Sequence, residues 1–277
     1  MIFKDLTCKF YKKNDLLNNK LIDSIIFFLS KISQDKSSLI ANQNYEIDFD
    51  INDFLYYYKQ VFIKQIPIEY IIKKIKFLGV IYNIDYGVFI PRNDTEFIVD
   101  WILESNFIND VNNVLDLCTG SGVIANTIKY YKKDLNVYGV DSSFAAIELA
   151  KDNAKLYDLD TKFYLKNIFS LKQDFLYNFD LIVCNPPYID KNHPLDISVK
   201  KYEPKKALFA KDQGLEYYKR FIFEIYPKLR KSNVKIIFEI GYDQKDKLED
   251  FLKNNNISNF FFLKDLNGHY RILVIDK

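Results

Sequence analysis

The segment Asn185-Pro186-Pro187-Tyr188 has the residue types needed to hold a planar NH2 group. Its two prolines have no backbone donor and a fixed φ, so their nitrogens cannot draw the neighbouring carbonyls into local turns. The side-chain oxygen of Asn185 and the carbonyl of Pro186 can therefore both accept hydrogen bonds from one NH2 group. The ring of Tyr188 can pack over that group.

Holding both hydrogens of such a group has a chemical use. The nitrogen of an amide or an exocyclic amine is a weak nucleophile because its lone pair is conjugated. Two fixed acceptors aim that lone pair and stabilise the positive charge that develops on the nitrogen during attack. Taken alone, the four residues are equally compatible with an Asn-Pro turn that ends a strand. They follow the fourth strand of a predicted sheet whose first strand carries a glycine loop, and this placement favours the chemical interpretation.

The glycine loop is Asp116-Leu117-Cys118-Thr119-Gly120-Ser121-Gly122, between a predicted strand and a predicted helix. Glycines at this place let the backbone turn tightly and approach a ligand at the carboxyl end of a sheet. The next strand ends at Asp141, 19 residues after Gly122, where a carboxylate can accept hydrogen bonds from both ribose hydroxyls of an adenosine. The pattern Gly120-x-Gly122-x-x-Ala125 also fits the dinucleotide fingerprint. A nicotinamide enzyme and a tight turn without a ligand therefore both remain open at this point.

The elements that would position these residues follow from the hydrophobic pattern. Beyond residue 113, short apolar runs alternate with amphipathic segments, which predicts a parallel sheet covered on both faces by helices. The last two strands have no long helix between them, which predicts an antiparallel hairpin at one edge. We expect strands at 114–117, 136–140, 162–165, 180–184, 234–240, 259–263 and 270–275, and helices at 123–131, 144–156, 215–229 and 244–254.

The chain before this sheet divides into two predicted parts. Residues 1–72 show apolar residues at three- and four-residue steps, which predicts a small helical domain. Residues 73–92 are predicted to form a β-hairpin linker, with strands at 78–82 and 88–90 and turn residues between them. The third part, 93–277, would begin with a helix capped by Asn93 or Asp94.

Composition excludes several classes of function. The net charge is +2, which gives no sign of a dedicated nucleic-acid binder. The longest strictly apolar run has five residues, Ile25–Leu29, against roughly 20 for a membrane helix. Cys8, Cys118 and Cys184 are odd in number and widely spaced, and with only two histidines they argue against a disulfide framework or a metal site. The residues near the start offer no signal-peptide core, so a cytoplasmic protein is expected.

Together with further segments, these motifs resemble a known family. The two site motifs are similar to those of class I S-adenosylmethionine-dependent methyltransferases that act on planar nitrogens. Phe89–Glu96 and the pattern Asp265-x-x-Gly268-x-x-Arg271 narrow the resemblance to the HemK/PrmC family, the peptide chain release factor glutamine methyltransferases. The resemblance extends from about residue 60 to residue 277. It implies a Rossmann-like α/β fold preceded by a helical substrate-recognition domain.

The resemblance also implies roles for single residues. Asn185, Pro186 and Tyr188 would be catalytic, and with Pro187 they would hold the substrate glutamine. The methyl donor, S-adenosyl-L-methionine, would be bound by Cys118, Thr119, Gly120, Ser121, Gly122, Asp141, Asn167, Ile168 and Asn185. In this set Asp141 would hold the ribose, whereas Asn167 and Ile168 would flank the adenine. Three residues depart from the usual family pattern, namely Asn93, Cys118 and Asn167.

The leading hypothesis is methyl transfer to the amide nitrogen of the glutamine in the Gly-Gly-Gln motif of release factors, which would modulate translation termination. One alternative is a methyltransferase that acts on an exocyclic amine of DNA or ribosomal RNA. Another is a non-catalytic S-adenosylmethionine-binding interaction protein, which the intact Asn185–Tyr188 segment disfavours. Release factors are the expected partners, without membrane association or stable nucleic-acid binding, and the expected state is a monomer.

Overall fold

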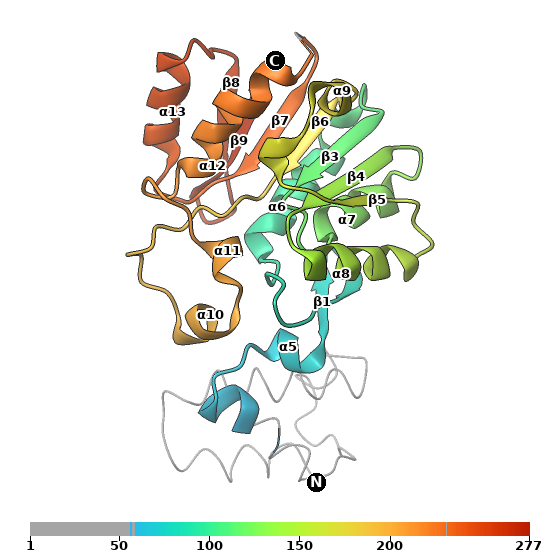
Figure 1. Ribbon diagram of the computed structural model, residues 1–277, viewed down its shortest axis with the longest axis vertical. Coiled ribbons are helices and arrows are strands. Elements are labelled where there is room, and N and C mark those ends of the chain that lie inside the picture. The colour runs from blue at the N-terminus through green and yellow to red at the C-terminus, as the bar shows by residue number, and fades with distance from the viewer. Residues whose placement is uncertain (1–55, 57–58, 231) are drawn as a thin grey trace. The chain divides into compact units, whose positions relative to one another are not determined.

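The computed structural model describes residue 56, residues 59–230 and residues 232–277 (Figure 1). Contacts within the chain divide it into two units, Met1–Ile72 and Lys73–Lys277. In the first unit, the described residues form a π-helical turn, Lys59–Ile63, and a short helix, α5 (Ile68–Ile72). The other helices expected before residue 56 lie outside the described residues. In the part of the chain that is described, no helix is both long and apolar enough to span a membrane.

The second unit is built on a seven-stranded sheet in the order β5-β4-β3-β6-β7-β9-β8. Strands β3 to β7 are parallel, whereas β9 is antiparallel to both β7 and β8. This arrangement confirms the parallel sheet and the antiparallel edge hairpin predicted from the sequence. The strands are β3 (Asn113–Leu117), β4 (Asn136–Asp141), β5 (Lys162–Leu165), β6 (Leu181–Cys184), β7 (Lys235–Glu239), β8 (Phe260–Lys264) and β9 (Tyr270–Asp276).

Helices pack on both faces of this sheet (Figure 1). The first face packs against α6 (Asn93–Glu104), α7 (Val123–Tyr131) and α8 (Phe144–Lys155). The second face packs against α9 (Gln173–Leu176), α12 (Glu216–Arg220) with its continuation to Lys228, and α13 (Lys245–Asn254). Successive side chains point to opposite faces of a strand. Val114 accordingly joins the first core and Leu115 the second, which explains why these strands are apolar at nearly every position.

The predicted helix at 215–229 proved to be irregular. It begins as α12, continues as a π-helical segment, Phe221–Ile225, and ends as a 3-10 turn, Tyr226–Lys228. Pro227 lies in this last turn and cannot donate a backbone hydrogen bond, so a regular α-helix cannot pass through it. Two further short helices, α10 (Ile197–Tyr202) and α11 (Lys205–Leu208), were not predicted. They are too short to show a helical hydrophobic period.

The structure corrects two details before the sheet. The hairpin consists of β1 (Lys74–Phe77) and β2 (Val80–Asn83), with the turn at Leu78 and Gly79. The strands predicted at 78–82 and 88–90 were therefore misplaced. Helix α6 is capped by Arg92 rather than by Asn93 or Asp94, and the cap makes no side-chain hydrogen bond. The guanidinium of Arg92 instead pairs with the buried carboxylate of Glu203.

Candidate active site

The predicted site residues meet at a cavity of about 420 Å³ at the carboxyl ends of the parallel strands. From β3 the chain runs outward through β4 and β5, and it then crosses to β6 on the other side of β3. Ligands of open α/β sheets bind at such a reversal of strand order. The predicted residues that line the cavity are Cys118, Thr119, Gly120, Ser121, Asp141, Asn185, Pro186, Pro187 and Tyr188.

Hydrogen bonds within the loop after β3 give it a fixed shape. The buried carboxylate of Asp116 accepts from Thr119 Oγ1 at 2.5 Å and from the backbone N–H of Ala125 at 3.3 Å. Burial raises the pKa of Asp116 to about 7. Cys118 adopts a positive φ of 60°, a conformation that is costly for a residue with a Cβ.

Gly122, which was predicted to contact the methyl donor, is not part of the cavity wall. It precedes α7, and a Cβ added to it would lie 2.7 Å from the Cβ of Ala150 in α8. Atoms this close would overlap, so Gly122 allows α7 and α8 to pack together. Its role in the structure is helix packing behind the loop, and its predicted contact with the methyl donor is untested.

Asp141 lies at the end of β4, directly beside the glycine loop. One carboxylate oxygen, Oδ2, accepts from the backbone N–H of Gly120 at 3.0 Å, and the other accepts from Ser143 N at 2.8 Å. Burial raises the pKa of this carboxyl group, although the backbone donors oppose the shift. Asp141 therefore joins the loops after β3 and β4, and each oxygen keeps lone-pair capacity for a ligand hydroxyl.

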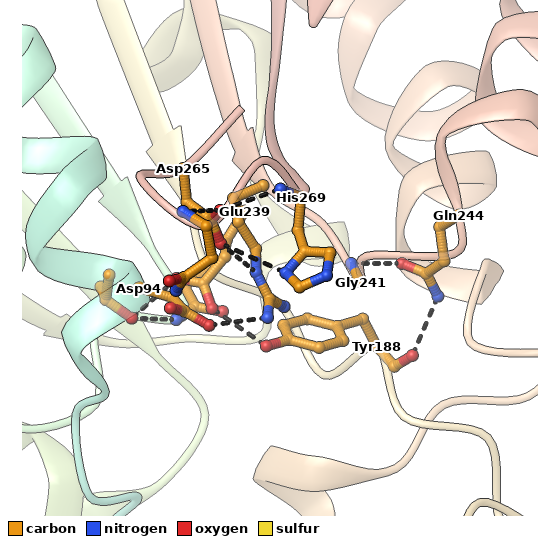
Figure 2. Close-up of polar contacts among 11 residues, drawn as sticks. Asp94, Tyr188, Glu239, Gly241, Gln244, Asp265 and His269 are labelled. Carbon is orange, nitrogen blue, oxygen red and sulfur yellow. Dashed lines mark hydrogen bonds and ion pairs between the residues drawn. The ribbon is translucent and has the colours of Figure 1, made fainter. Parts of the chain in front are cut away.

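The Asn185–Tyr188 segment follows β6 and is held at several points. Asn185 Nδ2 donates to Thr95 Oγ1 at 3.1 Å. The Tyr188 hydroxyl donates to Glu239 Oε1 at 3.0 Å, and the Tyr188 carbonyl accepts from Gln244 Nε2, also at 3.0 Å. Figure 2 shows the Tyr188 ring with its hydroxyl toward Glu239 and its carbonyl toward Gln244. The segment is thus fixed at both of its ends.

Two residues at the base of this segment were missed in the sequence. Thr95, in the first turn of α6, lines the cavity, and its hydroxyl donates to Glu239 Oε2 at 2.7 Å. Glu239 is fully buried at the end of β7, and burial raises its pKa to about 7. A signal for Glu239 was present, because a single acid at the end of an apolar strand must have a partner when it is buried.

Asn167 and Ile168, which were predicted to flank the adenine, are not part of the described cavity wall. Asn167 caps a 3-10 turn, Ile168–Ser170, and its Oδ1 accepts from the backbone N–H of Phe169 at 3.0 Å. Ile168 is buried in the second core. Their proposed contact with the adenine remains a prediction.

Comparison with known proteins then identifies the family. The chain is 33% identical over 280 residues to a release factor glutamine methyltransferase of Clostridium acetobutylicum, covering 99% of this chain and 98% of that protein. It is 31% identical to a protein of the same name from Clostridium botulinum, with the same coverage of both chains. The chain belongs to the release factor glutamine methyltransferase family. Residues 93–201 also match the family described as Methyltransferase small domain.

Solved structures agree with this family at the level of the fold. The human hMettl16 catalytic domain, solved with an RNA hairpin, has a TM-score of 0.54 at 16% identity, covering 81% of this chain and 91% of that one. A 16S rRNA methyltransferase from T. thermophilus, solved with AdoMet and guanosine, has a TM-score of 0.50 at 18% identity. The match covers 74% of this chain and 49% of that one. At these identities the likeness supports the class I methyltransferase fold alone.

The cavity suits S-adenosylmethionine, the cofactor of this methyltransferase family. A volume of about 420 Å³ lies within the range of roughly 300–1,000 Å³ for small-molecule sites. The Asp141 carboxylate would supply acceptors for the two ribose hydroxyls. The loop at 118–121 would face the methionine end, and Asn185 lines the same cavity.

We expect the change Asp141→Ala to weaken S-adenosylmethionine binding by about 1.5–3 kcal/mol, the range for hydrogen bonds to a charged group. The change also leaves the Gly120 N–H without its acceptor, which should loosen the loop. Isothermal titration calorimetry measures the affinity. Asp160→Ala is the matched control, because Asp160 is exposed and pairs with Lys129 away from the cavity. Unchanged affinity in Asp141→Ala would reject its role at the ribose.

At position 167, we expect Asn167→Asp to change cofactor affinity little or to improve it. A carboxylate can replace the amide oxygen both as the cap of the 3-10 turn and as an acceptor for the adenine amine. Asn167→Ala should lose roughly 1 kcal/mol of binding free energy. If calorimetry shows that the alanine variant binds as well as the wild type, position 167 is outside the adenine pocket.

Proposed function

We propose that this protein transfers a methyl group from S-adenosylmethionine to the side-chain amide nitrogen of the glutamine in the Gly-Gly-Gln motif of peptide chain release factors. Such a modification would modulate translation termination. We further propose that the protein acts in the cytoplasm as a monomer, without stable nucleic-acid binding, and that residues 1–72 recognise the substrate. The observation that carries the proposal is the position of Asn185 and Pro186 in the wall of the cavity that suits the cofactor.

The chain's own residues would act mainly by positioning and electrostatics. Asn185 Oδ1 and the Pro186 carbonyl accept the two hydrogens of the glutamine amide, and the Tyr188 ring packs over its plane. Bound S-adenosylmethionine supplies a methyl group that is activated by the sulfonium charge. As the amide nitrogen attacks, it becomes positively polarised, and the two fixed acceptors stabilise that charge more than they stabilise the ground state. The proton can leave to solvent after the transfer, so no general base is required.

The test is a competition between acceptors. Radiolabelled S-adenosylmethionine is incubated with the protein and with purified release factor, ribosomes and DNA, both separately and together. We expect the label to appear in the release factor. Preferential labelling of ribosomes or DNA would replace the proposal with an exocyclic-amine methyltransferase. Cofactor binding without labelling of any acceptor would indicate a non-catalytic binding protein.

A further inference from the structure

We propose that Thr95 and Glu239 are positioning residues of this reaction, and that they fix the orientation of the Asn185 amide so that its oxygen is the atom available to the substrate. The inference rests on the proposed function and adds two residues to its machinery. Thr95 comes from the start of α6 and Glu239 from the end of β7, 144 positions apart. Two successive hydrogen bonds, from Thr95 to Glu239 and from Asn185 to Thr95, connect a buried carboxylate to the cavity wall.

The direction of both hydrogen bonds follows from the chemistry of the Glu239 carboxylate. An ionised carboxylate can only accept. The single hydroxyl hydrogen of Thr95 is therefore committed to Glu239 Oε2, at 2.7 Å. The Thr95 oxygen can then offer only lone pairs to Asn185, so the amide must turn its NH2 group toward Thr95, as observed at 3.1 Å.

This direction matters because the two ends of an asparagine amide have opposite hydrogen-bonding character. With Nδ2 held by Thr95, Oδ1 is the acceptor that remains for a substrate NH2 group. A flipped amide would present two donors instead, and these would repel the hydrogens of a glutamine amide. Glu239 thus makes one of two nearly isosteric orientations favourable, which is a form of electrostatic preorganisation.

Glu239 also anchors the second substrate-facing residue. Its other oxygen, Oε1, accepts from the Tyr188 hydroxyl at 3.0 Å, and its backbone carbonyl accepts from Tyr218 at 2.8 Å. One buried carboxylate therefore positions both the amide that accepts from the substrate and the ring that packs over it. The close-up in Figure 2 shows the Tyr188 hydroxyl directed toward Glu239.

The charges around Glu239 bear on its ionisation. Burial raises the pKa of Glu239 to about 7, against the opposing effect of the hydrogen bonds from Thr95 and Tyr188. The charge of Asp94 on α6 also raises this pKa, whereas that of Arg271 on β9 lowers it. Arg271 is itself shared, since it pairs with Asp94 at 2.9 Å and with Asp265 at 3.3 Å, and His269 lies 4.0 Å from Asp265. Below about pH 7, protonated Glu239 can donate to Thr95, and the flipped amide then becomes favourable. Turnover should therefore rise as pH increases through this value.

The variants Thr95→Val, Thr95→Ser and Glu239→Gln test the proposal in single-turnover methylation of a release factor with the cofactor saturating. In metalloenzymes, replacing a residue that orients a metal-binding side chain typically lowers activity about 10- to 100-fold. We expect a loss of similar size in the methylation rate of Thr95→Val, because Thr95 orients Asn185 in the same way. The affinity of this variant for S-adenosylmethionine should fall much less than its rate, because Thr95 is one of many residues that line the cavity. Thr95→Ser should restore the rate because it keeps the hydroxyl. In Glu239→Gln, the rise of the rate with pH should disappear.

Thr127→Val is the matched control. Thr127 is a fully buried threonine whose hydroxyl bonds to Tyr82 Oη at 2.8 Å, and it is not part of the cavity wall. It should lose similar stability while its methylation rate is unchanged. Thr95→Val at the wild-type rate, or Glu239→Gln with the wild-type pH profile, would overturn the proposal.

A second measurement does not depend on activity. The side-chain amide signal of Asn185 in a nitrogen-15 NMR spectrum is assigned by its loss in Asn185→Ala. It should shift with pH around the Glu239 pKa of about 7 in the wild type, and it should not shift in Glu239→Gln. If the chemical shift of the Asn185 amide in the wild type does not change with pH in this range, the orientation mechanism is rejected. If the wild type labels no release factor while the signal does titrate, the proposed function fails and the orientation mechanism stands.

Discussion

Replacing Asn185 with alanine is expected to lower kcat by about 10²–10³, the range for removal of one preorganised electrostatic partner. Asn185 Oδ1 matters most when the substrate nitrogen becomes positively polarised, so turnover should fall more than substrate affinity. The cofactor affinity should fall less than kcat, because Asn185 is one of many residues that line the cavity. The measurement is single-turnover methylation of a release factor at saturating cofactor.

Asn136→Ala is the matched control for this variant. Exposed Asn136 begins β4, at the opposite end of that strand from Asp141. Its side chain bonds only to half-buried Asn113 among the described residues. The control should methylate at the wild-type rate. An Asn185→Ala variant that keeps most of its rate would rule out the amide clamp.

A second large effect is expected at Gly214, which packs against the backbone of Tyr188. Its φ is +84°, and an added Cβ would lie 2.0 Å from the Tyr188 carbonyl oxygen and 2.5 Å from Gln244 Nε2. Gly214→Ala must therefore displace the carbonyl and break the bond from Gln244. A shift of about 1 Å in positioned groups can lower kcat about 100-fold, and we expect a loss of that size. The strained backbone should also cost about 1–3 kcal/mol of stability.

Gly79→Ala separates the two contributions. Gly79 has nearly the same φ, +81°, but its added Cβ would meet only Tyr131 Oη at 3.5 Å, an ordinary contact. It lies in the β1–β2 turn, outside the cavity wall. Chemical denaturation should show a loss of stability in both variants, whereas methylation should slow only in Gly214→Ala. Rates reduced equally in the two variants would show that backbone strain, and not the Tyr188 contact, controls activity, and a wild-type rate in Gly214→Ala would show that the Tyr188 contact does not matter.

Much of the sheet could be predicted because its strands are covered on both faces. Val123–Tyr131 and Lys162–Leu165 were placed at their observed bounds, since helix periods and continuous apolar runs are local signals. The β1–β2 hairpin was misplaced because Asn83, Asp85 and Gly87 have a stronger turn composition than Leu78-Gly79. Apolar residues lie on both sides of each candidate turn, so hydrophobicity could not decide between them.

Some residues of the candidate site could be predicted from the local sequence, whereas the role of others depends on residues far away in the sequence. Asp141 and Asn185 could be predicted because each follows directly on a strand of the parallel sheet, and such ends meet at one edge. Thr95 could not, because its function depends on Glu239, 144 residues away. Nothing local to a helix start distinguishes a threonine that caps from one that orients an amide. Glu239 carried the clearer signal, an acid in the strand Lys235–Glu239.

The most direct test of glutamine methylation compares a wild-type release factor with one whose Gly-Gly-Gln glutamine is replaced by alanine. Both are incubated with the protein and radiolabelled S-adenosylmethionine, and the labelled peptide is located by mass spectrometry. We expect one methyl group on that glutamine in the wild-type factor and no label in the replaced factor. Labelling that persists after the glutamine is removed, or a wild-type factor that stays unlabelled, would contradict the proposed function.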